Sequence, residues 1–203
     1  MKKVIIIGAG GHGKVVADIV NLSGDEVVGF LDDKRQCELP EFNIIGTATD
    51  IGVRDCWYFV AVGNCIVREK LMQHDVQWYT AIHPTSVIAE GVKIGHGSCI
   101  MANAVINSGS KLGRGVIINT AATVDHDCVI SDFVHIAPGV HISGTVMVGK
   151  NCWVGVGSTI SNNVSICSDC TIGAGTVVIK SIDEAGTYVG VPSKRIRERN
   201  SMR

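Results

Sequence analysis

From Ile82 onward, aliphatic residues recur at every sixth position of the chain. Seventeen consecutive positions of this series, ending at Val178, are Ile, Val or Leu. The residue four places further on is Val, Ser, Ala, Cys or Thr from Val92 to Thr176. A period of six does not match the 3.6-residue turn of an α-helix, so no helix could hold these positions on one face. The pattern predicts a parallel β-helix with three short strands in each coil of eighteen residues, its aliphatic side chains pointing inward.

The first eighty residues follow a different pattern, in which short apolar runs alternate with helical periodicity. Val4–Ile7 is a β-branched run of the kind that is buried on both faces of a parallel sheet. Val27–Leu31 and Trp57–Val62 are two further predicted strands, and apolar residues at helical spacing follow the first and the third. We therefore expect an α/β, Rossmann-like half domain ahead of the β-helix. The expected boundaries are residues 1–80 for this domain, 81–185 for the β-helix and 186–203 for a C-terminal tail.

A glycine-rich loop joins the first predicted strand to the first predicted helix. It satisfies the G-x-G-x-x-G pattern in the required strand-to-helix context, beginning at Gly8. Such a loop lets phosphate groups approach the helix N-terminus, and a half-size domain suits a mononucleotide rather than a dinucleotide. The alternative is a tight turn that packs strand against helix and binds nothing. The candidate binding residues at this sheet edge are Gly10, Gly11, His12, Gly13, Asp32, Gly63 and Asn64.

Composition narrows the possible partners. The chain has 18 Lys and Arg against 19 Asp and Glu, a net charge of −1, which gives no electrostatic case for nucleic acid or an acidic membrane surface. No apolar stretch approaches the roughly 18 residues of a membrane span. The N-terminus lacks the pattern of a secretory signal, so we expect a cytoplasmic protein whose eight cysteines are reduced.

The cysteines fit the repeat rather than a metal site. Cys128, Cys152 and Cys170 occupy small inward positions, where a free cysteine packs as a core residue. Cys167 and Cys170 form a CxxC pair, but no second pair follows at the spacing that zinc requires. We therefore expect no metal.

The run Asp125-His126-Asp127, at a predicted corner of one coil, is the candidate for proton transfer. An adjacent carboxylate can fix the tautomer of an imidazole and stabilise the imidazolium that forms when it accepts a proton. Gly144 lies one coil further on and would leave space and an open backbone N–H beside the ring. His135 precedes an inward position and is expected to point outward, where a neighbouring subunit could complete a site. The alternative for both histidines is a plain surface position.

The two domains together resemble a known family. The repeat is similar to that of the hexapeptide acyltransferases. The whole chain resembles the nucleotide-sugar acetyltransferases of bacterial surface-glycan and sialic-acid pathways, such as the bacillosamine and perosamine N-acetyltransferases. The stretches that carry the resemblance are Gly8–Val15, Phe30–Asp33, Val62–Asn64, Ile82–Pro84, Asn119–Thr120, Asp125–Ile130 and Gly190–Lys194.

The resemblance implies roles for the candidate residues. His126 would be the general base and Asp127 would orient it, with Asp125 able to share that role. The glycine loop, Asp32 and Asn64 would hold the nucleotide sugar, joined by Asp33 and Arg68, and Asn119 would lie near the acceptor sugar. The acetyl-CoA side would include His135, Gly144, Gly155, Gly173, Pro192 and Lys194.

The resemblance also implies a left-handed β-helix, a homotrimer and acetyl-CoA bound between adjacent subunits. The implied activity is direct acetyl transfer to the amino group of a UDP- or GDP-linked amino-deoxy sugar. O-acetylation of a sugar of the sialic-acid type is the alternative within the same class. The alternative from another class is a non-catalytic, nucleotide-binding module built on a β-helix.

Overall fold

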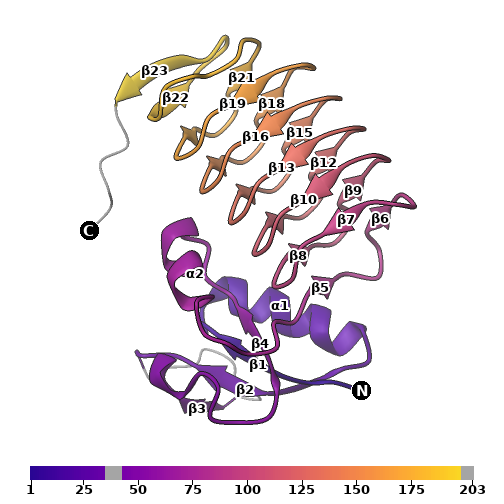
Figure 1. Cartoon of the computed structure of the whole chain (residues 1–203), viewed down its shortest axis with the longest axis vertical. Coiled ribbons are helices and arrows are strands. Elements are labelled where there is room, and N and C mark those ends of the chain that lie inside the picture. Colours follow the sequence, from indigo (N-terminus) through magenta and orange to yellow (C-terminus); the bar gives the residue numbers. More distant parts are fainter. Residues whose placement is uncertain (35–42, 198–203) are drawn as a thin grey trace.

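The computed structural model describes residues 1–34 and 43–197, and it has an α/β domain at one end and a long stack of β-coils above it (Figure 1). The α/β domain contains one four-stranded parallel sheet in the order β3-β2-β1-β4. Its elements are β1 (Lys3–Ile7), α1 (Gly11–Leu22), β2 (Glu26–Leu31), β3 (Ile44–Gly46), the 3-10 helix η1 (Ala48–Asp50), β4 (Trp57–Val60) and α2 (Cys65–Leu71).

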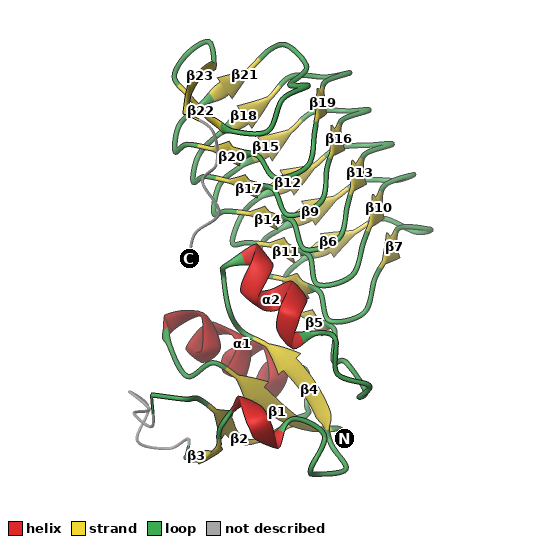
Figure 2. Ribbon diagram, turned by 60° about the vertical axis from the view of Figure 1, so that its left-hand side comes forward, coloured by secondary structure: helices red, strands yellow, loops and turns green. Residues whose placement is uncertain are grey.

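The stack is a parallel β-helix, built from two-residue strands that begin every six residues (Figure 2). Two longer strands, β22 (Thr187–Val189) and β23 (Lys194–Arg197), close its far end. The short strands are β5 (Ala81–Ile82), β6 (Val87–Ile88), β7 (Lys93–Ile94), β8 (Cys99–Ile100), β9 (Val105–Ile106), β10 (Lys111–Leu112), β11 (Ile117–Ile118), β12 (Thr123–Val124), β13 (Val129–Ile130), β14 (His135–Ile136), β15 (His141–Ile142), β16 (Met147–Val148), β17 (Trp153–Val154), β18 (Thr159–Ile160), β19 (Ser165–Ile166), β20 (Thr171–Ile172) and β21 (Val177–Val178).

Each short strand pairs in register with the strand that lies three further along the chain, one coil away. β10, for example, pairs in parallel with β7 on one side and with β13 on the other. The result is three faces: a five-stranded sheet from β7 to β19, a six-stranded sheet from β6 to β21, and an eight-stranded sheet from β5 to β23. The eight-stranded sheet carries the α/β domain at its β5 end (Figure 2).

The predicted aliphatic column is the core of the β-helix. Ile100, Ile118, Ile136 and Val154 have no exposed surface and belong to one continuous apolar cluster that runs through the coils. Cys128, Cys152 and Cys170 are buried in the same cluster, as expected for small inward residues. The predicted fold class, an α/β domain followed by a parallel β-helix of hexapeptide repeats, is therefore confirmed.

The corners of the coils have a left-handed residue at a fixed position, and it is not the residue directly after the aliphatic one. Gly155 and Gly173, which follow aliphatic positions, do not have positive φ. The left-handed residue is the third after the aliphatic position, as at Asp127 with φ of 59°. At Gly155 the requirement is space, because a Cβ there would lie 2.8 Å from the backbone of the next coil.

The two domains share a core across their junction. Val16, Ala17 and Ile19 of α1 pack in one buried cluster with Ala81 and with outward residues of β8 and β11. β5 begins at Ala81, next to the expected domain boundary at residue 80. The boundary stays a prediction, because the buried cluster contains residues from both sides of it. Within the described residues, no helix has the length and apolar character needed to cross a membrane.

The inward column makes a direct prediction about stability. Replacing the fully buried Ile136 with alanine removes apolar contacts that neighbouring coils cannot refill, so we expect Ile136→Ala to lower the free energy of unfolding by about 2–5 kcal/mol. The matched control is Lys93→Ala, at an exposed outward position of β7, for which we expect a change within about 0.5 kcal/mol. Urea unfolding of both variants measures the difference, and an equal loss in the two would contradict an inward column.

Candidate functional site

His126 lies at the corner between β12 and β13, with its ring in contact with the next residue. Its Nδ1 is 2.9 Å from Oδ2 of Asp127, and both side chains are more than half exposed. Asp127 reaches back to the ring because its own backbone is left-handed, a conformation that aspartate tolerates better than most residues. If Nδ1 carries the proton and donates it to the carboxylate, Nε2 is left as a proton acceptor.

Gly144 lies one coil further on, directly against the His126 ring. A Cβ at Gly144 would lie 2.5 Å from Nε2 and 2.6 Å from Cε1, so any side chain there would displace the imidazole. The Gly144 N–H donates no hydrogen bond to another described residue, whereas its carbonyl accepts from the N–H of Asn163 at 3.1 Å. Gly144 therefore leaves room for the imidazole and keeps an N–H without an acceptor among the described residues, and contact of that N–H with a ligand stays a prediction.

The carboxylates raise the pKa of His126 above its ordinary value. The largest cause is the hydrogen bond to Asp127, and the charge of Asp125 adds to it. The structure also separates the roles of the two aspartates. Asp125 turns away from the ring: its Oδ1 accepts the backbone N–H of His126 at 2.8 Å and the amide of Asn107 at 2.8 Å. Asp127 is therefore the residue that contacts the imidazole.

The glycine loop forms the second group of candidate residues, at the carboxyl edge of the four-stranded sheet. Gly10 and Gly11 face open space, since a Cβ at either would meet no atom within 4 Å. Gly13 instead packs α1 against β1, because a Cβ there would overlap the carbonyl oxygen of Gly8. Both interpretations of the glycine motif therefore apply to this loop. Gly13 packs the helix against the strand, and the start of α1 is open to a ligand.

Asp32 and Asp33 line a hollow of about 190 Å³ beside this loop, together with Gly8 and Val62. Their carboxylates are already engaged: Asp32 accepts the backbone N–H of Ala9 at 2.8 Å, and Asp33 accepts that of Ala48 at 3.0 Å. The structure therefore places both aspartates as supports of the loops around the hollow. Contact between them and a ligand stays a prediction.

His135 joins the two domains at the eight-stranded sheet. Its Nδ1 is 3.3 Å from the carbonyl oxygen of Gly63, and its Nε2 is 3.2 Å from the amide nitrogen of Asn119. These partners require a neutral ring that donates from Nδ1 and accepts at Nε2. The ring stacks on His12 with centroids 6.5 Å apart, and it meets Trp153 edge-on at the same distance. The sequence grouped His135 with acetyl-CoA; in the structure its neighbours are His12, Gly63 and Asn119, and its contact with acetyl-CoA stays a prediction.

Burial keeps this pair of histidines neutral. It lowers the pKa of His12 to about 3 and that of His135 to about 4, with a further lowering from the charge of Arg68. The Nε2 atom of His12 is buried and has no hydrogen-bond partner among the described residues. A buried polar atom without a partner is costly, which makes it a candidate contact for a bound ligand or water.

Arg68 was expected to bind the nucleotide sugar, and the structure places it elsewhere. The side chain is fully buried and donates to the carbonyl oxygens of Gly115 and Phe133 in the β-helix, each at 2.7 Å, and of Val62 and Gly63 in the α/β domain at 2.8 and 3.1 Å. Because no surface is left for a ligand, Arg68 has a structural role: it ties α2 and the Gly63 turn to the coils.

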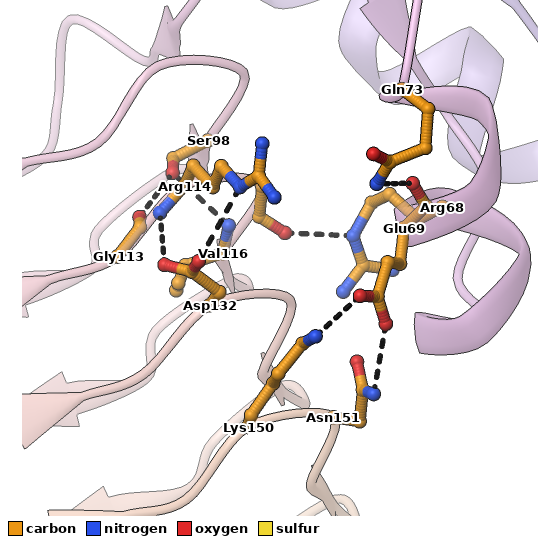
Figure 3. A network of polar contacts seen from close by, with 11 residues as sticks. Arg68, Glu69, Gln73, Ser98, Gly113, Arg114, Val116, Asp132, Lys150 and Asn151 are labelled. Carbon is orange, nitrogen blue, oxygen red and sulfur yellow. Dashed lines mark hydrogen bonds and ion pairs between the residues drawn. The ribbon is translucent and has the colours of Figure 1, made fainter.

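The neighbouring residue Glu69 strengthens the same junction from the outside. Figure 3 shows its carboxylate between Lys150 and Asn151 of one corner of the β-helix, both of which donate to it. Asn64 has a local role, since its Oδ1 accepts the N–H of Val67 at 3.0 Å and caps the N-terminus of α2.

The remaining candidates lie along one corner of the β-helix and at its far end. Gly155 and Gly173 follow β17 and β20 and share a corner row with Asn119, because the three positions are separated by multiples of eighteen residues. Pro192 and Lys194 belong to the turn and strand that follow β22, where Ser193 N–H donates to Val177. Their contact with acetyl-CoA stays a prediction.

Sequence reasoning missed three residues of these sites. Asn107 lies eighteen residues before Asp125, so the coil period itself could have revealed the contact. Trp153 lies eighteen residues after His135 on the same sheet, and it could have been found in the same way. Ser110, whose Oγ donates to the carbonyl of Asp125 at 2.8 Å, appeared only as a small core position.

Comparison with known proteins agrees with both halves of this architecture. Residues 3–74 match the model of the PglD N-terminal domain, and residues 145–180 match the model of the bacterial transferase hexapeptide, six repeats long. The fold and these two matches therefore define a hexapeptide-repeat transferase with a PglD-type N-terminal domain.

Two solved structures cover nearly the whole chain. The acetyltransferase domain of PglB from Neisseria gonorrhoeae FA1090 is 38% identical with a TM-score of 0.93, over 97% of this chain and 100% of that one. A second structure of that domain contains acetyl coenzyme A. PerB from Caulobacter crescentus, in complex with CoA and GDP-perosamine, is 32% identical with a TM-score of 0.90, over 97% of this chain and 98% of that one. The chain belongs to this family of hexapeptide-repeat acetyltransferases.

A curated relative extends the comparison by sequence. The UDP-N-acetylbacillosamine N-acetyltransferase of Bacillus subtilis (strain 168) is 35% identical over 113 residues, which is 50% of this chain and 52% of that protein. The matched region thus spans about half the length of this relative. In residues 1–34 and 43–197, no group of three or more His, Cys, Asp or Glu is arranged to hold a metal ion.

The buried histidines predict how stability depends on pH. The unfolded chain takes up a proton at His135 near pH 6.5, whereas the folded chain excludes it until about pH 4, so stability is lost as the pH falls through this window. We expect His135→Gln to reduce the difference between the free energies of unfolding at pH 7 and pH 5. His96→Gln, at an exposed position, is the control that should keep the wild-type difference. Urea unfolding at the two pH values tests this, and an unchanged difference in His135→Gln would contradict it.

Proposed function

We propose that the protein is an acetyl-CoA-dependent N-acetyltransferase that acts on a nucleotide-linked amino-deoxy sugar. The observation that carries the proposal is the His126 ring, held by Asp127 on one side and lying close to Gly144, whose N–H has no acceptor among the described residues, on the other. A general base next to a free backbone donor is what acyl transfer from a thioester requires.

The reaction is direct transfer. The neutral amine of the sugar attacks the thioester carbonyl of acetyl-CoA and forms the new C–N bond. His126 Nε2 takes the proton that the amine loses, while the imidazolium is stabilised by its Nδ1–H donated to Asp127. The Gly144 N–H stabilises the oxyanion of the tetrahedral intermediate. When the C–S bond breaks, the thiolate of CoA leaves and takes up a proton from His126.

The nucleotide sugar binds at the edge of the α/β domain. The open start of α1 at Gly10 and Gly11 accepts the diphosphate, and the hollow beside Asp32 takes the nucleoside. The buried Nε2 of His12 and the amide of Asn119 face the sugar end of this site. UDP and GDP are the two nucleotides proposed, since UDP appears in the name of one relative and GDP-perosamine is bound in another.

A homotrimer completes the active site. In one chain, His126 lies at the corner between the six- and five-stranded sheets, whereas His12 and His135 lie at the eight-stranded sheet. A neighbouring subunit is proposed to bring its α/β domain to this corner and to form, with the row of Gly155 and Gly173 and the turn at Pro192 and Lys194, the cleft for acetyl-CoA. We place the reaction in the cytoplasm of a bacterium, in the synthesis of a surface glycan.

The proposal predicts the effect of removing the base. We expect His126→Ala to lower kcat by about 10²–10⁴-fold with little change in the KM of either substrate, because the ring acts on the transferred proton rather than on binding. The measurement is thiol release from acetyl-CoA in the presence of UDP- and GDP-linked amino sugars and of free sialic acid. His96→Ala serves as the matched control, and its kcat should stay at the wild-type value.

Each outcome of this assay decides between the candidate functions. Activity with an amino sugar that depends on His126 supports the proposal, and activity with sialic acid alone would make the protein an O-acetyltransferase. A protein that binds nucleotide in a calorimetric titration but neither binds nor consumes acetyl-CoA would be a non-catalytic module. Full activity of His126→Ala would remove His126 as the base.

A further inference from the structure

We propose that Asn107 is a positioning residue for His126 and that it acts through the carboxylate of Asp125. The inference rests on the proposed function, because it gives His126 the role of the base. Asn107 lies one coil before Asp125 at the same corner, and its side chain donates to Asp125, whereas the imidazole is bonded to Asp127. Its effect on the reaction would therefore be transmitted through one intermediate side chain.

A single oxygen of Asp125 holds two groups of this corner. Oδ1 of Asp125 accepts the amide N–H of Asn107 at 2.8 Å and the backbone N–H of His126 at 2.8 Å. The carboxylate therefore links the His126 N–H to the coil below, while the His126 carbonyl accepts the N–H of Thr145 in the coil above at 2.9 Å. Ser110, also from that coil, holds the main chain at the same point through its bond to the carbonyl of Asp125.

Little else positions the His126 ring. The side chain is 55% exposed, and beside its bond to Asp127 it lies against Gly144, which offers no side chain to pack on. A displacement of the backbone at His126 therefore moves the ring relative to the Gly144 N–H. Proton transfer to His126 and stabilisation of the oxyanion both depend on the position of the ring relative to the Gly144 N–H. A displacement of the ring by a fraction of an ångström therefore lowers the rate.

Asp125 and Asp127 are the two charged groups that act on His126, and both raise its pKa. The residues above and below the corner, Gly144 and Ser108, are uncharged. The hydrogen bond from Asn107 is the largest cause of the lowered pKa of Asp125, so it keeps this carboxylate ionised beside the imidazolium. Asn107 thus supports both the geometry of the base and its affinity for the proton.

The experiment is a double-mutant cycle in the full chain. We expect Asn107→Ala to lower kcat by about 2–10-fold with unchanged KM values, the range for loss of one hydrogen bond. Asp125→Ala should lower kcat at least as much, and adding Asn107→Ala to it should have no further effect, because the partner is already gone. The matched control is Asn21→Ala, an exposed asparagine of α1, which should keep the wild-type kcat.

A titration of the imidazole separates positioning from general loosening of the fold. Asp125→Asn removes the charge but keeps an oxygen that can accept the two N–H groups. We expect it to lower the pKa of His126, measured from the Cε1–H resonance that is absent in His126→Ala, and to move the acid limb of the kcat/KM profile to lower pH. Asp18→Asn, which removes an exposed charge of α1, should move neither.

The possible results separate this inference from the proposed function. Two results would overturn the role of Asn107 alone. One is that the effects of Asn107→Ala and Asp125→Ala on kcat simply add, and the other is that Asn107→Ala keeps the wild-type kcat while His126→Ala is inactive. Full activity of His126→Ala would overturn both. A lowered urea midpoint in Asn107→Ala with a wild-type kcat would show that the contact stabilises the coil and does not position the base.

Discussion

The in-register stacking of eighteen-residue coils is the constraint on which the rest of the structure depends. Each aliphatic residue rests on the one eighteen positions before it, so an insertion of even one residue would turn inward positions outward. The same register aligns the corners. Asn107, Asp125 and Ser143 therefore form one row and His126 and Gly144 another, and the contacts of the candidate site are consequences of the period.

The junction between the domains depends on a different interaction, the buried guanidinium of Arg68. A permanent charge in a protein interior requires hydrogen bonds in compensation, and here backbone carbonyls of both domains supply them. The acceptors belong to the Gly63 turn of the α/β domain and to two successive coils of the β-helix. The guanidinium therefore holds the Gly63 turn in a fixed position relative to those coils. The Gly63 carbonyl that it holds also accepts from His135, which connects the junction to Asn119.

Much of this architecture could be predicted from the sequence, because a repeat with a fixed period determines which residues stack. The aliphatic column, the buried cysteines and the corner position of His126 all follow from it. The roles of Asp32, Asn64 and Arg68 could not be predicted in the same way. Each has a side chain suited to a ligand, and in each the donors or acceptors are used by nearby backbone groups. The sequence does not show that backbone groups, rather than a ligand, use these donors and acceptors.

The structure gives its histidines two opposite electrostatic environments. His126 is exposed between two carboxylates, which stabilise its protonated form and suit it to accept a proton. His12 and His135 are desolvated near a permanent cation, which stabilises their neutral forms. Both ring nitrogens of His135 are already bonded, one to the Gly63 carbonyl and the other to the Asn119 amide, whereas Nε2 of His12 has no partner among the described residues. The junction between the domains therefore holds its imidazoles in the uncharged form, while the corner at His126 favours the charged form of the same ring.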